Sequence, residues 1–446
     1  MCSSIIVQNL GPLKNVSIDL SAEFSVIIGP QASGKSTLGK IIYFCKKIRD
    51  YAIEFVSNED MFLSNLSYDD IYKSFLRSLH KKYLENFDFG KTEYEDFLIK
   101  YNYDENNFIL INLDNEKNII FEFSREIEAR LKSFFSGVRE FNLDNMKREG
   151  EEWKFTFRDF WQRLEAQQFR EKFLKDSVFH DDSEIIYVPA GRGIFSILAD
   201  QLSVASGLNF GLPIIDFIKR VQAAKARFKK NLDKVVEDYA KTDREPVNND
   251  DLQLAQDIIR KILKADYVND TDGEKLYFDS NNWVRLIYGS SGQQEALWIL
   301  LLMFSLILEH KKAFVILEEP EANVYPNAQL DIIKLIALTL NSTKSKFFIT
   351  THSPYIMTSA NLLIHSGQVE NKIINDNGDS IIPKQLRINP EVTAAYKITD
   401  SKNEIHNIRD QETGMFDASE IDTISDIIGE ATDKLIDLEI EHECRE

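Results

Sequence analysis

The sequence predicts an α/β fold built on a mixed, largely parallel sheet, with antiparallel strands near the N-terminus and helical insertions in the middle of the chain. Three observations lead to this prediction. An apolar strand at 24–28 runs into the loop GPQASGKST, two later apolar strands at 313–317 and 346–350 end in charged or polar residues, and long amphipathic segments separate the first strand from the others. Buried strands with polar groups at their carboxyl ends are typical of parallel sheets that bind ligands at one edge.

The loop after the first strand fits a phosphate-binding motif. Residues 29–36 match G-x-x-x-x-G-K-[ST] between a predicted strand and a predicted helix, whereas a chance glycine turn is the alternative. The two glycines permit the tight turn that directs backbone N–H groups at phosphates. Lys35 is then expected to reach the β- and γ-phosphates, and Ser36 to bind Mg²⁺. The residues predicted to contact the nucleotide here are Gly29, Pro30, Gln31, Ala32, Ser33, Gly34, Lys35, Ser36 and Thr37.

The composition is that of a soluble globular protein. Of 446 residues, 43% are hydrophobic and 28% are charged, which allows two or three domains of ordinary size. The formal net charge of −19 disfavours indiscriminate binding to nucleic acid, although it allows a local basic surface. Three scattered cysteines do not suit a disulfide framework or a zinc site. We therefore expect a cytoplasmic protein without a secretion signal and, because the apolar run 296–308 is too short to cross a bilayer, without a membrane span.

Local patterns divide the chain further. Strands are expected at 4–7 and 16–20 around the turn Leu10-Gly11-Pro12, a hairpin at 108–113 and 119–123, and helices at 50–100 and 124–175. The predicted domains are a lobe with the phosphate-binding loop and antiparallel strands at 1–125, a helical insertion at 126–265 that includes a central strand at 184–188, a lobe at 266–365 that contains the two later apolar strands, and short strands with an acidic helix at 366–446.

Two basic features leave alternatives open. Arg192 follows the strand 184–188, where it could meet a phosphate or a partner subunit, or simply lie on the surface. Segment 214–239 reads as one long helix that carries Lys219, Arg220, Lys225, Arg227, Lys229 and Lys230. This helix could bind nucleic acid or a partner, but a solvated helix face is the commoner explanation of such a run.

Three stretches in the second half can complete a nucleotide site. Residues 288–295, YGSSGQQE, place small residues at the start of an apolar helix, where backbone N–H groups and the Ser290 hydroxyl can bind an anion. The strand 313–317 ends in Glu318 and Glu319, so one carboxylate can reach Mg²⁺ and the next can deprotonate a water. The strand 346–350 is followed by His352, at the edge where parallel sheets bind ligands.

In this order, the motifs GPQASGKST, SSGQQ, VILEEPE and FFITTHSP resemble the ATP-binding-cassette (ABC) ATPases, and most closely their soluble RecF/SMC-like and OLD-like branch. The resemblance implies an ABC-type P-loop ATPase head that uses ATP and Mg²⁺. It identifies Glu318 and Glu319 as the Walker B end, with Glu318 on the metal and Glu319 as general base, and His352 as the switch histidine that senses the γ-phosphate. The matching signature loop is Ser290, Ser291, Gly292 and Gln293.

The resemblance also implies a homodimer or higher homo-oligomer. Two chains would pack head to tail, so that ATP on Lys35 of one is capped by Ser290 and Gly292 of the other, and ATP would close the pair. Some positions depart from the family pattern. Glu318 replaces the usual aspartate, the D-loop at 322–326 lacks an aspartate, and no Q-loop glutamine can be placed, although the end of strand 184–188 could do its work.

The helical insertions and the C-terminal segment suggest a biological role. Lys35 and Ser290 are 255 positions apart, and no TOPRIM nuclease elements follow His352. In this the chain resembles ATPase subunits of two-component anti-phage systems such as Septu, PARIS and retron-associated ones, which implies a sensor or scaffold that controls a separate nuclease or toxin. The alternative is a RecF-like ATPase of DNA repair or maintenance, whose stimulation by DNA would be lost on reversing the charges of Lys225, Arg227 and Lys229. Energising a transporter is disfavoured by the long insertion.

Overall fold

Strands and helices alternate along the part of the chain that the computed structural model describes, which comprises residues 3–57, 67–87, 96–149, 168, 170–200, 210–241, 248–372, 381–399, 404–421 and 432–434. The strands are β1 (Ser4–Leu10), β2 (Leu13–Asp19), β3 (Phe24–Ile28), β4 (Leu98–Asn102), β5 (Phe108–Leu113), β6 (Ile119–Phe123), β7 (Glu184–Val188), β8 (Asp266–Asp270), β9 (Gly273–Tyr277), β10 (Trp283–Arg285), β11 (Ala313–Glu318), β12 (Lys346–Thr350), β13 (Thr393–Ile398) and β14 (Ile405–Asn407). The α-helices are α1 (Lys35–Val56), α3 (Tyr68–Asn86), α4 (Arg125–Glu149), α6 (Phe195–Asp200), α8 (Leu212–Arg227), α9 (Leu232–Ala240), α10 (Asn249–Leu263), α11 (Ser291–Glu309), α12 (Pro326–Thr343) and α13 (Pro354–Lys372). Among the single helical turns are η2 (Arg192–Ile194) and η3 (Leu286–Tyr288).

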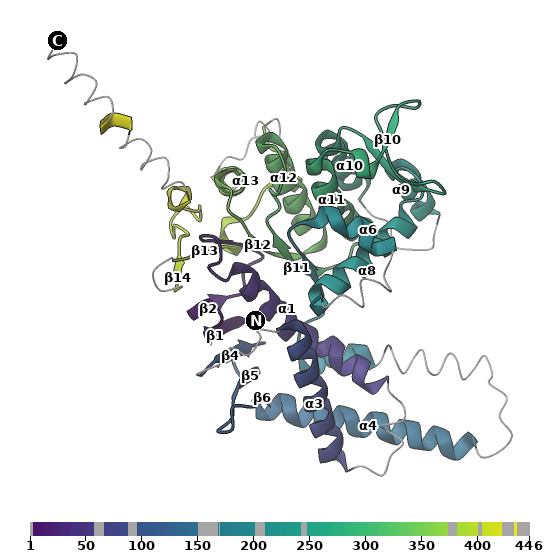
Figure 1. Cartoon of the computed structure of the whole chain (residues 1–446), viewed down its shortest axis with the longest axis vertical. Helices are drawn as coiled ribbons and strands as arrows, with labels where there is room; N and C mark the ends of the chain where they lie inside the picture. Colours follow the sequence, from purple (N-terminus) through teal and green to yellow (C-terminus); the bar gives the residue numbers. More distant parts are fainter. Residues whose placement is uncertain are drawn as a thin grey trace.

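A six-stranded sheet in the order β14-β13-β3-β12-β11-β7 forms the centre of the molecule (Figure 1). From β13 to β7 neighbouring strands are parallel, and β14 is antiparallel at the edge. Because parallel strands end at the same edge of a sheet, the loops after β3, β12, β11 and β7 lie side by side. The C-terminal strand β13 pairs directly with β3, so residues far apart in sequence build this edge together.

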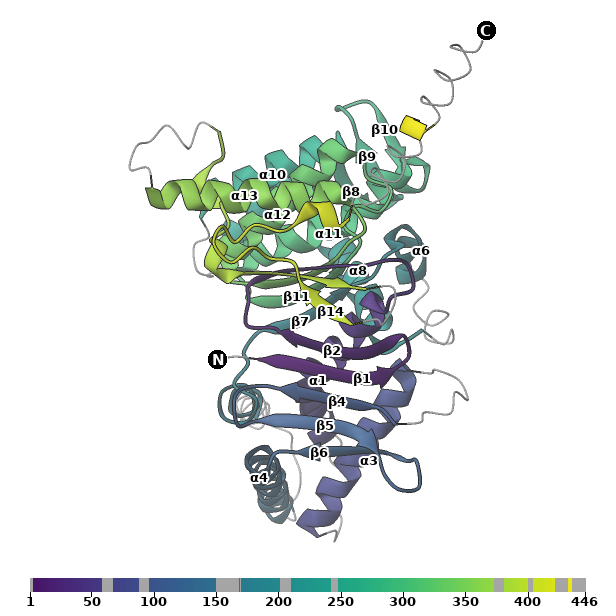
Figure 2. The same cartoon turned by 90° about the vertical axis from the view of Figure 1, so that its left-hand side faces the viewer.

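The six-stranded sheet separates two apolar cores, since successive side chains of a strand point to opposite faces. In β3, Phe24, Val26 and Ile28 belong to the core shared with α8, α10, α11, α12 and α13, whereas Ile27 belongs to the core shared with α1 and the antiparallel sheet. Figure 2 shows α10 to α13 on one side of the sheet and the antiparallel strands on the other. Helix α1 therefore begins at the phosphate-binding loop and is buried between two sheets.

The second sheet is antiparallel, in the order β2-β1-β4-β5-β6. Both predicted hairpins are confirmed: β1 pairs with β2 around Gly11, and β5 pairs with β6 over 108–113 and 119–123. The prediction of helix up to residue 100 is wrong at its end, because β4 is a strand between β1 and β5. Its buried residues alternate with half-buried ones, a period of two that is hard to see over five residues.

The predicted helix 214–239 is two helices. α8 ends at Arg227, and α9 begins after Asn231, whose side chain accepts a hydrogen bond from the Lys234 N–H as an N-cap. Between them Phe228 is buried, and its carbonyl accepts the Asn269 N–H at 2.8 Å. Of the predicted acidic helix 418–441, all but 418–421 and 432–434 lies outside the described residues.

Helix α11 contains the long apolar run. Over 291–309 it is long and apolar enough to cross a membrane by length and composition alone. From Ala296 to Leu308 nearly every side chain is buried, and the helix packs between α10 and α12. A helix buried by protein on its apolar sides is a core helix, as the sequence predicted.

Candidate nucleotide-binding site

The predicted site residues follow three adjacent strands of the six-stranded sheet. The register pairs Ile27 of β3 with Thr350 of β12, and Thr350 with Glu318 of β11. Leu317 of β11 pairs in turn with Val188 of β7. The phosphate-binding loop, the two acids, His352 and the loop after β7 therefore meet at one edge.

The phosphate-binding loop is held by backbone conformations that its glycines allow. Gly34 has φ +100°, and a Cβ there would lie 2.5 Å from Cδ2 of Leu13. The turn between β1 and β2 thus packs directly on the loop and leaves no room for a side chain. Ala32 has φ +62°, and the Ser33 hydroxyl is buried without a hydrogen-bond partner. The loop is a tight, preformed cradle that ends in the first turn of α1.

Lys35 is buried inside this cradle. Its Nζ donates hydrogen bonds to the carbonyls of Gly29 and Pro30, each at 2.8 Å. Burial lowers the pKa of Lys35 to about 8, and the nearby carboxylates, Glu319 first, limit the fall. Because this ammonium group is poorly solvated and its pKa is lowered, an anion such as a phosphate would strongly stabilise its charged form.

Glu318 has the features of a metal ligand. It lies on the same face of the sheet as Ile316, which packs on the α1 side, so it faces the helix that carries Ser36. Its Oε2 accepts the Ala190 N–H at 3.3 Å, whereas its Oε1 is buried without a partner. An orphaned carboxylate oxygen fits Mg²⁺. Within the described residues no cluster of three or more His, Cys, Asp or Glu side chains could hold a metal, so the ion would also depend on Ser36, phosphate oxygens and water.

Glu319 stands in a constrained backbone position with a half-exposed carboxylate. Its φ is +42°, a left-handed conformation that costs on the order of 1–3 kcal/mol for a non-glycine residue. Its N–H donates to the carbonyl of Thr350 at 2.8 Å, and its own carbonyl accepts hydrogen bonds from Ala322 and Arg192. The half-exposed side chain places Oε1 3.8 Å from Nε2 of His352. The surrounding hydrogen bonds therefore fix the direction in which the carboxylate points.

His352 is positioned by a third acid, Glu321, that sequence reasoning did not single out. Oε1 of Glu321 accepts the Thr351 hydroxyl at 2.7 Å and the His352 N–H at 2.8 Å. Burial raises the pKa of Glu321, and burial followed by the charge of Lys35 lowers the pKa of His352. His352 is therefore uncharged near pH 7. The last E of EEPE was the only sequence signal for Glu321.

The predicted signature loop begins α11. Ser290 Oγ accepts the Gln293 N–H at 3.2 Å and Gln293 Oε1 accepts the Ser290 N–H at 2.9 Å, which is a capping box. A Cβ on Gly292 would lie 2.7 Å from the carbonyl oxygen of Asn323, so this loop touches the loop after β11. Across the described residues no hydrogen bond or ion pair joins 290–293 to 29–37. In the described structure the loop 290–293 therefore lies against the loop after β11.

Both interpretations of Arg192, as a phosphate or partner contact and as a surface residue, are wrong. The side chain is 0% exposed. Its guanidinium donates to the carbonyls of Pro189, Glu318, Glu319 and Glu295 at 2.7 to 3.0 Å. Arg192 is an internal link between β7, β11 and α11, and these partners lie more than a hundred positions away in sequence, except Pro189.

The predicted basic face of 214–239 is also largely engaged within the protein. Lys225 is buried and bonded to the carboxylates of Asp200 at 2.8 Å and Glu274 at 2.9 Å. Arg227 forms an ion pair with Glu309 at the end of α11. Reversing the charge of Lys225 would therefore disrupt the core, and it is unsuitable as a test of DNA binding.

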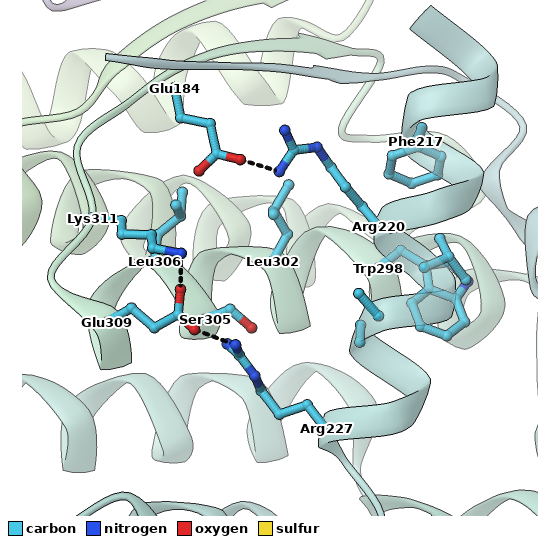
Figure 3. Close-up of a pocket in the computed structure, with 13 residues that line it drawn as sticks. Glu184, Phe217, Arg220, Arg227, Trp298, Leu302, Ser305, Leu306, Glu309 and Lys311 are labelled. Carbon is cyan, nitrogen blue, oxygen red and sulfur yellow. Dashed lines mark hydrogen bonds and ion pairs between the residues drawn. The ribbon is translucent and has the colours of Figure 1, made fainter. Parts of the chain in front are cut away.

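Among the described residues, a hollow lies at the other end of the sheet (Figure 3). It measures about 200 Å³ and is lined by α8, α11 and Glu184, the first residue of β7. Its charged rim is internally paired, Arg220 with Glu184 at 2.7 Å and Lys311 with Glu309 at 2.7 Å. Because β7 starts here and its carboxyl end forms the nucleotide edge, this hollow is separate from the site.

One family model and a number of solved structures are similar to this chain. Residues 1–357 match the family AAA_15, described as AAA ATPase domain. Among solved structures, the SmcHead bound to the C-winged helix domain of ScpA is similar with a TM-score of 0.41 and 12% identity, covering 91% of this chain and 96% of that one. The SMC head domain from Thermotoga maritima is similar with a TM-score of 0.37 and 11% identity, covering 91% and 98%. No curated protein matches the sequence. The predicted α/β fold, with a mixed, largely parallel sheet and antiparallel strands near the N-terminus, is confirmed.

Proposed function

We propose that this chain, which belongs to the AAA ATPase domain family, binds ATP with Mg²⁺ and hydrolyses the ATP to ADP and phosphate. The observation that carries the proposal is the convergence of Lys35, Glu319 and His352 at one edge of the six-stranded sheet. Hydrolysis needs positive charge on the phosphates and a group that orients and deprotonates water. A domain that only binds a nucleotide needs the positive charge on the phosphates but not the group that deprotonates water.

Each residue has a distinct part in this mechanism. The ammonium of Lys35 exchanges the carbonyls of its own loop for oxygens of the β- and γ-phosphates. The Ser36 hydroxyl and the unpartnered Glu318 Oε1 would hold Mg²⁺, which would supply neutralisation of the phosphate charge. Glu319 accepts the proton of the attacking water, and uncharged His352, beside it, forms a hydrogen bond with the γ-phosphate.

A second copy of the chain would complete this site. In the described structure no hydrogen bond or ion pair joins 290–293 to the phosphate-binding loop of the same chain. We therefore assign Ser290 and Gly292 to ATP held by the other copy. Apolar side chains that are more than half exposed occur in η2 and η3, before α12 and in the first turn of α13, and exposed apolar groups of this kind mark protein interfaces. They are Ile194, Ile287, Tyr288, Tyr325 and Tyr355.

Two variants test the proposal. Lys35→Ala is expected to weaken ATP binding and to abolish phosphate release. Glu319→Gln is expected to keep ATP affinity within a few fold, to slow turnover by roughly 10²–10⁴-fold and to accumulate the dimer with ATP. Glu116→Gln, on an exposed turn, is the matched control and should behave as wild type. Wild-type turnover in either site variant would contradict the assignment.

We further propose that the ATP-closed pair acts as a sensor or scaffold for a separate nuclease or toxin in anti-phage defence. The support is the sequence resemblance to the ATPase subunits of such systems, an ATPase head with insertions between its motifs. Affinity purification of Glu319→Gln from its host with ATP, followed by mass spectrometry, tests this. A co-purifying nuclease or toxin would support the proposal, whereas DNA alone would favour the repair-type alternative.

A further inference from the structure

Arg192 and Glu295 tie the loop after β7 to the first turns of the signature helix. Both side chains are buried. Glu295 Oε2 accepts the Arg192 N–H at 2.7 Å, and Glu295 Oε1 accepts the Gly193 N–H at 3.1 Å. Arg192 Nε donates back to the Glu295 carbonyl at 3.0 Å. The start of α11 is thereby fixed to this loop through both its side chain and its backbone.

The far end of the same guanidinium holds the backbone of the two Walker B acids. Nη1 donates to the carbonyl of Glu318 at 2.7 Å, and Nη2 donates to the carbonyl of Glu319 at 2.9 Å. Nη1 also donates to the Pro189 carbonyl at 2.9 Å. Glu319 has the uncommon φ of +42°, so its carbonyl direction depends on such external hydrogen bonds. Arg192 thus fixes the peptide that aims the Glu319 carboxylate.

The number and geometry of these hydrogen bonds explain why the position holds an arginine. Four carbonyl groups are bonded by one planar fork, with Nε facing α11 and the two Nη atoms facing β7 and β11. A lysine has three donors on one atom and cannot bridge these directions. The four carbonyl groups lie around a single guanidinium group. If the first turn of α11 shifts, the guanidinium of Arg192 must therefore move with it or lose hydrogen bonds.

We propose that the Arg192–Glu295 pair is a positioning link that sets the Glu319 carboxylate according to the place of the signature helix. Both side chains are buried and hydrogen-bonded within the chain, so we assign neither of them a contact with the nucleotide. When the signature loop of one chain binds ATP held by its partner, the position of its α11 is transmitted to Glu319 of the same chain through the four hydrogen bonds of Arg192. The inference rests on the proposed function and adds that hydrolysis in one site depends on the signature engagement made by the same chain.

The test uses the full-length chain and Glu295→Gln, which keeps the shape of the side chain but gives one of its two N–H partners an amide NH₂ instead of an oxygen. We expect binding of a fluorescent ATP analogue to change by less than about threefold and turnover to fall by at least about tenfold. Glu309→Gln, at the other end of α11, is the matched control and should retain wild-type turnover.

Combination with Glu319→Gln separates positioning from a general structural effect. If Glu295 acts through Glu319, the double variant is as slow as Glu319→Gln alone, because the base is already absent. A further multiplicative loss in the double variant, or a loss of ATP affinity in Glu295→Gln, overturns the inference. Wild-type turnover in Glu319→Gln would instead overturn the proposed function.

Arg192→Lys provides a second route in case Glu295→Gln does not fold, as judged by thermal unfolding. It retains the charge and loses the fork, so the same pattern is expected, with near-normal ATP affinity and slow turnover that is not additive with Glu319→Gln. Wild-type turnover in Arg192→Lys would overturn the inference as well.

Discussion

Raising the pH from 7.5 to 9.5 is expected to weaken ATP binding by about 25-fold, or about 1.9 kcal/mol, because the pKa of Lys35 lies near 8. With that pKa, roughly three quarters of the lysines are charged at the lower pH and roughly 3% at the higher. Burial depresses the pKa in the free protein, and bound phosphate raises it again. Binding therefore takes up a proton above pH 8, so affinity is full below this value and lost as the pH rises through it.

The assay is titration of a fluorescent ATP analogue with Mg²⁺ across this range, with near-ultraviolet circular dichroism to show that the fold persists. Lys35→Arg is the matched control, since a guanidinium keeps its charge throughout. Its affinity is expected to be lower but constant with pH. A constant wild-type affinity would refute the reasoning about Lys35, and an equal decline in both proteins would show that a different group titrates.

Two further substitutions test packing around the site and the basic segment. Gly292→Ala would place a Cβ 2.7 Å from the carbonyl oxygen of Asn323, so the loop after β11 must shift. We expect turnover, measured by phosphate release, to fall at least about tenfold, while the ATP affinity of the single chain, measured by nucleotide titration, is kept. Lys225→Met leaves the Glu274 carboxylate buried without its cation and should lower the free energy of unfolding by about 3–5 kcal/mol, whereas Arg227→Ala, at a partly exposed ion pair, should cost less than about 1 kcal/mol in the same denaturant titration.

The sequence was sufficient to predict which loops meet at the edge of the sheet, because each motif directly follows a recognisable strand. A parallel strand must end where its neighbour ends, so an apolar run followed by GKST, by two acids or by His352 fixes which loops meet. The two hairpins were predictable for a similar reason, since local alternation and a turn at Gly11 are both readable over a few residues. Residues that follow strands in regular order can be placed without knowledge of the rest of the chain.

What escaped prediction depends on distant partners. Arg192 bonds the carbonyls of Glu318 and Glu319 across more than a hundred positions, and nothing near it in the sequence shows that these acceptors exist. The break after α8 is of the same kind, because the Phe228 carbonyl receives its hydrogen bond from Asn269. A buried charge and a helix end were each read from local composition, which favours the solvent-exposed interpretation by default.

The placement of the basic segment bears on whether this face of the chain binds DNA. Five of the seven cations of 214–239 are bonded to acids of the same chain: Arg220 to Glu184, Lys225 to Asp200 and Glu274, Arg227 to Glu309, Lys230 to Asp238, and Lys234 to Glu237. A phosphate backbone would have to displace these carboxylates, which removes most of the gain from counterion release that drives nonspecific DNA binding. Lys219 and Lys229 are the exposed cations of this segment left for such a contact, so a clamp on DNA through this face is weakly supported. The apolar and aromatic loops at the nucleotide edge favour protein partners instead, first a second copy of the chain.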